Sequence, residues 1–522
     1  MPKNYRIMTF DDMHDSLKKR YFYKLSTNAL GLILGFFNQA IIPRGLGPKA
    51  YGDFNFLNSF FTFLVAFFDT GTSTCFYIKL SQRQREPKIV LFYVYFIGAV
   101  LLFMTVFMTV ANLAGARDKL WPGQLTGYIY LAAFLAILVW ATTLAIQMAD
   151  AYGLTVSVEI KRMFLKIFSL ALIALLFVNN KLNLLNFFIY NYVVSIALIA
   201  LVLGIIIKRG YLLLESWKLK WAEVKSYALE FYNYSHPLFV SSSVGVVISM
   251  LDIWLLQVWG GSVQQGFFGL SNQISNICFF FTGAMTPLMM REFSVAHGDN
   301  DIKRMATLFR RNIPLLFSVT AFISCFAVVN ADKLTIILGG GKFREAYMAV
   351  AIMSIYPIHR VYGQMTGSLF YATGQTKLFR NISLFFAVIG LPFTYILLAP
   401  ARFFGLNMGA GGLAIKTVLI CIIAVNVQLY FNSRFLGLSF WKYIAHQAAS
   451  VGSFLFIAVL ISFGLRYAMG KDVNIILGLL ASGTAYTIVV GLFVYFYPRI
   501  FGLVKTDIDR LKGLLLRSPV IG

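Results

Sequence analysis

Long apolar runs of about 20 residues recur along the whole chain, and short polar stretches separate them. A helix of that length crosses the roughly 30 Å hydrocarbon core of a bilayer. The pattern predicts membrane-spanning helices near residues 24–42, 51–77, 89–112, 125–149, 160–179, 184–207, 236–259, 265–290, 312–330, 347–371, 381–399, 411–432, 443–465 and 473–497. Fourteen spans would place both ends of the chain on the same side of the membrane.

The composition agrees with an all-α polytopic membrane protein. Hydrophobic residues make up 59% of the 522 positions and charged residues only 13%, whereas soluble domains carry about 25% charge. Residues 1–24 contain several charges and no apolar core, so they do not match a cleavable signal. The four cysteines fall inside predicted spans without metal-ligand spacing, and we interpret them as packing residues and expect no metal site.

Lysine and arginine are distributed unevenly between the two sets of loops. The loops on the side of the termini carry 32 of these residues and the opposite loops carry 11. Because cytoplasmic loops of membrane proteins are enriched in Lys and Arg, both termini are predicted to be cytoplasmic. Most of the net charge of +24 then reflects topology, so we expect anionic lipid headgroups as partners and no nucleic acid.

The chain repeats itself at an offset of 214 residues. "IIPRGLGPKAYGDF" at 41–54 aligns with "LLQVWGGSVQQGFF" at 255–268, which places Gly47 on Gly261. Six-helix halves of the same orientation are a known transporter architecture. The predicted parts are a cytoplasmic segment (1–23), an N-lobe (24–207), an amphipathic cytoplasmic linker (208–235), a C-lobe (236–432), two further spans (443–497) and a cytoplasmic tail (498–522).

Polar residues follow one another at helical spacing in the first two spans of each half. Their stripes include Asn38, Asn58, Thr62, Ser249, Asn272 and Asn276. Four such helices, two from each half, suggest the walls of a polar cleft between the halves. Small polar residues also let membrane helices pack closely, and that explanation stays open.

Ionisable residues inside the spans are costly and often functional. Arg360 lies near the middle of its span, just after Pro357, which is expected to bend the helix. Tyr356 and Gln364 share its face, whereas His359 points about 100° away. A central guanidinium in a cleft would bind an anion such as phosphate.

Other charged residues complete this picture. Lys416, Arg44 and His359 are further candidates for a cationic, substrate-binding cleft, and Asp252 and Asp69 are candidates for ion coupling. A structural ion pair is the alternative for the residues inside spans, and anchoring at the headgroup level is the alternative for Arg44.

Several motifs resemble those of one transporter family. They are "RGLGPKAYGDF" at 44–54, "REFSVAHGDNDIKRM" at 291–305, "ILGGGKFREA" at 337–346 and "YATGQTK" at 371–377. As a set they are similar to the polysaccharide transporters of the multidrug/oligosaccharidyl-lipid/polysaccharide exporter superfamily, which include O-antigen and lipid-linked oligosaccharide flippases. The resemblance implies two lobes in a V-shaped arrangement that alternates between inward-open and outward-open states. It carries over no catalytic residue.

The resemblance implies a flippase in the bacterial inner membrane. It would move an undecaprenyl-pyrophosphate-linked glycan to the periplasmic leaflet, with H⁺ or Na⁺ as coupling ion and no other cofactor. Expected partners are this glycan, the bilayer and the polysaccharide polymerase machinery. Two alternatives stay open: multidrug extrusion, which the central arginine disfavours, and a membrane glycosyltransferase or polymerase, which the short outer loops disfavour.

Overall fold

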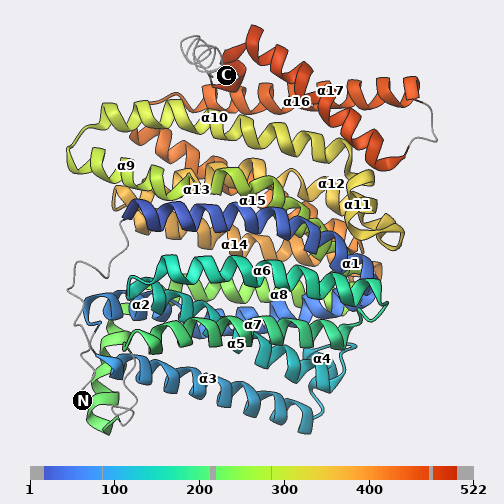
Figure 1. Cartoon of the computed structure of the whole chain (residues 1–522). Helices are drawn as coiled ribbons and strands as arrows, with labels where there is room; N and C mark the ends of the chain where they lie inside the picture. The colour runs from blue at the N-terminus through green and yellow to red at the C-terminus, as the bar shows by residue number, and fades with distance from the viewer. Residues whose placement is uncertain (1–16, 85, 212–218, 284, 470–473, 503–522) are drawn as a thin grey trace, which may run out of the picture. The chain divides into compact units, whose positions relative to one another are not determined.

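The protein was studied as a computed structural model that describes residues 17–84, 86–211, 219–283, 285–469 and 474–502 (Figure 1). These residues form helices and no strand. The α-helices are α1 (Leu17–Asp69), α2 (Thr72–Gln82), α3 (Pro87–Leu113), α4 (Arg117–Leu120), α5 (Thr126–Ala151), α6 (Thr155–Val178), α7 (Leu184–Lys208), α8 (Trp221–Gly283), α9 (Thr286–Gly298), α10 (Ile302–Val329), α11 (Ala331–Gly339), α12 (Tyr347–Met353), α13 (Tyr356–Ala372), α14 (Thr376–Leu398), α15 (Gly409–Phe435), α16 (Phe440–Met469) and α17 (Ile475–Phe496).

The helices confirm the predicted all-α membrane fold. Nine helices of the described residues are long and apolar enough to cross a bilayer, and a bent helix pair, Leu34–Asp69 with Thr72–Gln82, is a tenth candidate. The count of fourteen spans stays a prediction, because several expected spans occur as merged or broken helices.

Two of the merged helices break at a single glycine. In α1, Gly47 has φ 74° and ψ 170°, so it separates two helical arms where spans 24–42 and 51–77 were expected. In α8, Gly261 has φ 69° and ψ −175° and separates the next such pair. This backbone region is accessible essentially only to glycine, because a Cβ atom would clash there. The predicted turns between these spans are therefore single glycine breaks.

Two further breaks divide helices that were expected to be continuous. α1 ends at Asp69, and α2 continues at an angle of 53° after Gly71, which has φ 94°. α12 ends at Met353 and α13 begins at Tyr356, with Pro357 in its first turn. Proline lacks the N–H that would continue the preceding helix, so a helix break lies beside Pro357, where the sequence predicted a bend.

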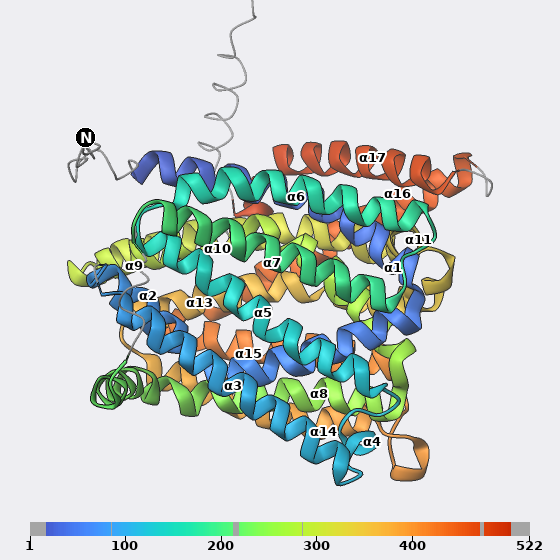
Figure 2. The ribbon, with the colours of Figure 1, turned by 60° about the horizontal axis from the view of Figure 1, so that its bottom comes forward.

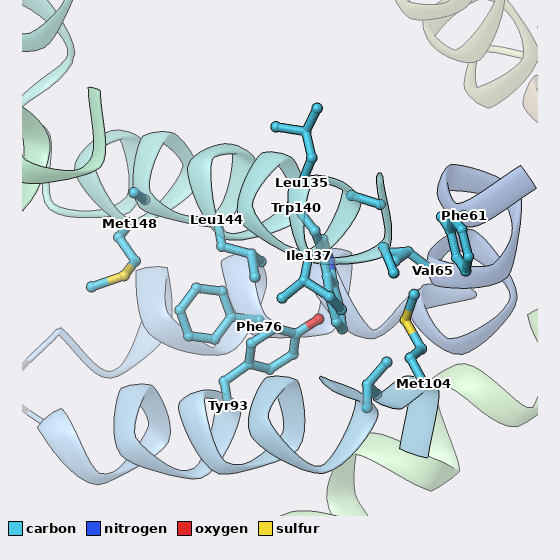
Figure 3. Close-up of a cluster of buried hydrophobic side chains, with 14 of the residues drawn as sticks. Phe61, Val65, Phe76, Tyr93, Met104, Leu135, Ile137, Trp140, Leu144 and Met148 are labelled. Atoms are coloured by element: carbon cyan, nitrogen blue, oxygen red, sulfur yellow. The ribbon is translucent and has the colours of Figure 1, made fainter. Parts of the chain in front are cut away.

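The chain divides into two compact units, residues 1–265 and 266–522. In the first unit α5 contacts α1, α2, α3 and α7 (Figures 1 and 2). Its core holds large aromatic side chains: the rings of Phe76 and Tyr93 lie 4.7 Å apart, and Trp140 of α5 packs at 5.9 Å from Tyr93 (Figure 3). Burial of these side chains stabilises the contacts of α2 and α3 with α5.

The predicted linker 208–235 is only partly described, since residues 212–218 lie outside the described ranges. From Trp221 onward it is the beginning of α8 and runs without a loop into the apolar part of that helix. Ion pairs attach this part to the α2–α3 turn: Glu230 lies 2.7 Å from Lys79 and 2.8 Å from Arg83. The predicted N-terminal segment and C-terminal tail lie largely outside the described residues.

The second unit is built around α13 and α15. α13 contacts α9, α10 and α15, and α14 contacts the other side of α15. α16 packs on α10 and α17 packs on α16 (Figure 2). The helices α16 and α17 expose large apolar side chains, among them Phe456, Phe463 and Leu480. Such a surface suits contact with lipid tails.

Candidate functional site

The candidate site is the side of α13 that carries Arg360, and we call it the uncovered face because Arg360 is exposed there, while Tyr356 and Gln364 are half-buried. Tyr356, Arg360 and Gln364 follow one another at intervals of four residues, so they lie along one side of the helix. The opposite side is buried against α9, α10 and α15. This uncovered strip is polar and aromatic, in contrast to the apolar surface of α16 and α17.

Arg360 is exposed, and Tyr356 positions its guanidinium group. Nη1 of Arg360 donates a hydrogen bond of 3.0 Å to the Tyr356 hydroxyl. Cζ of Arg360 also lies 5.3 Å from the centre of the Tyr356 ring, a distance typical of a cation–π contact. The two contacts hold the charged group along the helix.

His359 lies on a different face of α13. Its side chain is only 9% exposed, and its ring packs edge-on at 5.9 Å from Phe317 of α10. Its Nδ1 has no hydrogen-bond partner in the part of the chain that the structure describes. The structure therefore does not bring His359 together with Arg360, in agreement with their angular separation on a helix.

Two other predicted residues, Lys416 and Gln364, contact neighbouring helices of the second unit. Lys416 of α15 is buried, and its aliphatic chain runs close to Gly390 of α14, where an added Cβ would approach Lys416 Cε to 2.9 Å. Gly390 thus makes room for this lysine. Gln364 of α13 accepts a hydrogen bond of 2.7 Å from Thr286 of α9, so its carbonyl oxygen is already engaged.

The residues of the polar stripes occupy both units. In the second unit Asn272 and Asn276 are exposed on α8. In the first unit Arg44 and Thr62 are exposed, and Asn38, Asn58 and Ser249 are half-buried.

Two of these stripe residues differ in their hydrogen bonding. The Asn38 side-chain oxygen finds no hydrogen-bond partner in the described ranges. The Ser249 hydroxyl donates a hydrogen bond of 2.9 Å to the Gly245 carbonyl within its own helix, so this hydroxyl needs no ligand as acceptor.

Asp69 lies at the break between α1 and α2. Its Oδ1 accepts hydrogen bonds from the Ser73 backbone N–H at 2.8 Å and from the Thr72 hydroxyl at 3.0 Å. The Tyr93 hydroxyl also reaches Oδ1, at 3.5 Å. Asp69 therefore acts as a cap for the start of α2, which is a structural role in addition to the proposed coupling role.

Asp252, the other candidate for ion coupling, is half-buried on the first arm of α8. That arm belongs to the first unit, where Trp254 donates from Nε1 to the Lys119 carbonyl at 3.0 Å. Gln257 similarly donates to the Pro122 carbonyl at 3.0 Å. These contacts fix the arm that carries Asp252 against the loop around α4.

Sequence reasoning overlooked a buried charged pair on α6. Glu159 is only 1% exposed, and its carboxylate lies 3.3 Å from the Arg162 guanidinium. Lys166, one turn further along, donates to the Thr27 carbonyl of α1 at 3.0 Å. The signal was available in the sequence, because opposite charges three residues apart face each other on a helix.

The described residues contain no group of three His, Cys, Asp or Glu side chains that could hold a metal ion. The chemistry that α13 presents is that of an arginine beside a tyrosine ring. Such a pair can bind an anionic oxygen through the guanidinium, and an aromatic ring can pack against the apolar face of a sugar.

Comparisons with known proteins bear on the fold. No family model and no curated protein matches the sequence. Among solved structures, "Lipid II flippase MurJ, inward closed conformation" is 13% identical, with a TM-score of 0.64 over 91% of this chain and 99% of that chain.

A second solved structure is described as the "inward-facing conformation of a multidrug resistance MATE family transporter of the MOP superfamily". It is also 13% identical, with a TM-score of 0.58 over 81% of this chain and 98% of that chain. The protein thus shares the fold of these two solved transporters.

Proposed function

We propose that this protein is a flippase that moves an undecaprenyl-pyrophosphate-linked oligosaccharide, such as an O-antigen or another surface polysaccharide unit, across the bacterial inner membrane. The observation that supports it most is the exposed guanidinium of Arg360 on the uncovered face of α13. The similarity to the solved lipid II flippase supports the same class of transport.

The energetics of the bilayer favour a substrate role for Arg360. An arginine at the middle of a span costs at least about 2.5–3.5 kcal/mol on insertion scales. A pyrophosphate group offers oxygen atoms to both arms of the guanidinium, which a lysine could not match in geometry. Tyr356, which already lies against Arg360, would contact the sugar next to the pyrophosphate.

The remaining features of the proposed cycle follow from the sequence and from the surroundings of two carboxylates. Alternating access would expose the binding face first to the cytoplasm and then to the periplasm, with both termini cytoplasmic and with H⁺ or Na⁺ as the coupling ion. Binding of that ion must favour one state over the other. Asp252 and Asp69 are the residues that we propose to bind this ion. A polysaccharide polymerase would receive the product.

Multidrug extrusion is the second candidate, because the solved MATE transporter has the same fold. The charge of the uncovered face separates the two functions. A face centred on Arg360 repels a cationic drug and attracts a phosphate, so the flippase accounts better for the arginine. The transporter fold likewise makes a glycosyltransferase or polymerase the weaker alternative.

The test is transport in proteoliposomes that contain undecaprenyl-pyrophosphate-linked oligosaccharide. The rate of flipping is measured as the rate at which glycan becomes accessible to a membrane-impermeant lectin. We expect Arg360→Ala to lower the rate at least tenfold and Arg360→Lys to lower it nearly as much, because lysine lacks the bidentate geometry.

Arg402 supplies a matched control. It is also exposed, and its Cζ lies 5.0 Å from the Phe403 ring, but it lies outside the apolar spans in the loop after α14. Arg402→Ala should leave transport unchanged. Equal rates for the wild type and Arg360→Ala at equal protein levels would refute the proposal, whereas transport of cationic drugs in place of the glycan would favour the second candidate.

A further inference from the structure

The first unit contains a pocket that has no role in the proposed function. It has a volume of about 670 Å³, within the range of ~300–1,000 Å³ that is typical of small-ligand sites. Four segments line it: the end of α1, the start of α2, the first turns of α3 and the first part of α8. Its lining residues are Phe68, Thr70, Thr72, Phe92, Phe96, Ala228, Phe231, Tyr232, Ser235, His236 and Phe239.

Aromatic side chains form most of this pocket. The rings of Phe92 and Phe231, from α3 and α8, lie 5.2 Å apart and form one of its walls. Tyr232 and His236 lie 5.1 Å apart on the exposed side of α8. A lining of this kind favours a hydrocarbon chain as ligand, because burying each CH₂ group contributes about 0.8 kcal/mol.

One hydroxyl in the pocket lacks a partner. Ser235 is only 8% exposed, and its Oγ has no hydrogen-bond partner among the described residues. The two threonines of the lining differ from it, since Thr70 donates to the Phe67 carbonyl and Thr72 to Asp69. A buried donor without a partner is costly, so the ligand should bring an acceptor to Ser235.

The depth of the pocket fits the boundary between headgroups and lipid tails. Phe92 and Phe96 lie five and nine residues after Pro87, where the apolar helix α3 begins. At 1.5 Å per residue, this places them about 7–14 Å into the span. The α8 residues of the pocket end at Phe239, just before the apolar segment Ser242–Cys278. Ser235, which precedes that segment, then lies at the level of a phospholipid ester carbonyl, and Phe92 and Phe96 lie at the level of its acyl chain.

The charged side chains near the pocket already form ion pairs with one another. Glu230 pairs with both Lys79 and Arg83, and Lys88 pairs with Glu223 at 2.5 Å. A pyrophosphate would have to compete with these carboxylates for the same cations. A lipid that is held by its chain and its ester group needs no such competition, which favours a phospholipid over the prenyl-pyrophosphate substrate.

We propose that this pocket binds one acyl chain of a membrane phospholipid, with its ester carbonyl accepting a hydrogen bond from Ser235. The bound chain would lie between α3 and the first part of α8 and add an apolar contact to the ion pairs of Glu230. This site is separate from the face of α13 and does not depend on the proposed function.

The experiment uses the full-length protein in liposomes with a trace of diester phosphatidylcholine that carries a photoreactive diazirine on one acyl chain. Cross-linked peptides are identified by mass spectrometry. We expect the wild type to cross-link at residues 92–96 and 228–239. Ala228→Trp, which fills the pocket, should reduce this signal at least fivefold. Ala222→Trp, at an exposed position on the same helix outside the pocket, should leave it unchanged.

A second arm tests the hydrogen bond. Ser235→Ala should lower cross-linking of the diester probe about threefold and leave a matching diether probe, which has no carbonyl, unchanged. No cross-link at these residues, or an equal loss in Ala222→Trp, would overturn the site. Equal responses of the diester and diether probes would overturn the role of Ser235. Displacement of the probe by undecaprenyl pyrophosphate would assign the pocket to the substrate and overturn the proposed phospholipid.

Discussion

Gly47 and Gly261 hold nearly the same backbone conformation at positions 214 residues apart, with φ of 74° and 69°. Each interrupts a long helix, α1 or α8, at a position that the internal repeat aligns. The matching breaks indicate that the repeat preserves a backbone requirement even where the surrounding side chains have diverged. Only a residue without Cβ meets that requirement cheaply.

Replacement of the break glycine by alanine should therefore destabilise the protein through the backbone alone. At Gly261 an added Cβ meets no atom within 4 Å, so the expected cost of about 1–3 kcal/mol is conformational. Gly245, in the helical part of α8, also has open space and has no positive φ. Gly245→Ala should be neutral or slightly stabilising, since alanine is favoured over glycine in helices. Thermal unfolding in detergent measures both variants, and equal melting temperatures would contradict this explanation of the break.

Substitutions of Asp69 can separate its role as a cap of α2 from its proposed role in ion coupling. Asparagine keeps an oxygen that can accept from the Ser73 N–H and the Thr72 hydroxyl, so Asp69→Asn should retain most of the stability. Asp69→Ala removes the acceptor and should cost about 0.5–2 kcal/mol. If Asp69 also carries the coupling ion, Asp69→Asn should abolish the pH dependence of glycan transport while the protein stays folded. An unchanged pH profile would leave capping as its role.

The ion pairs at the start of α8 predict a pH-dependent contribution to stability. A hydrogen bond from Lys79, and then one from Arg83, lowers the pKa of Glu230 below its ordinary value, and Lys88 does the same for Glu223. A carboxylate with a depressed pKa stabilises the folded state above the ordinary glutamate pKa of about 4.3, and this stabilisation is lost as the pH falls through the lowered value.

Glu230→Gln should accordingly lower the melting temperature at pH 7, and this difference from the wild type should shrink as the pH falls below about 4.3. The loss at pH 7 should be about 1 kcal/mol or less, because these pairs are partly exposed. Glu345→Gln supplies a control with an exposed glutamate remote in sequence from this turn. A difference between the wild type and Glu230→Gln that persists unchanged at pH 3 would contradict the role of the ionised carboxylate.

Tyr356 should influence transport through Arg360. Tyr356→Phe keeps the ring under the guanidinium but removes the hydroxyl that accepts from Nη1 at 3.0 Å. Loss of one hydrogen bond of about 0.5–1.5 kcal/mol should slow glycan flipping about two- to tenfold. Tyr356→Leu removes both contacts and should approach the rate of Arg360→Ala. If Tyr356→Leu transports at the wild-type rate, the tyrosine does not position the arginine.

Much of the fold was accessible from the sequence. Helix positions follow from apolar runs, because a backbone in hydrocarbon must satisfy its hydrogen bonds within a helix. The conformation of Gly47 and Gly261 could be anticipated from their alignment in the repeat, and the bend before Arg360 from Pro357. These features depend on local rules of chain geometry, so the identity of a few residues is enough to predict them.

The surroundings of the candidate residues were decided by tertiary packing. The sequence by itself determined that Arg360 and His359 point to different sides of one helix, but only the contacts of α10 show that the histidine is buried and the arginine is uncovered. The sequence likewise made Asp69 a candidate for ion coupling, but only the break after α1 shows the two donors beside it. Hydrophobic and polar periodicity gives the direction of a side chain relative to its own helix. Which neighbour covers that side is set by long-range packing, which periodicity within one helix does not encode.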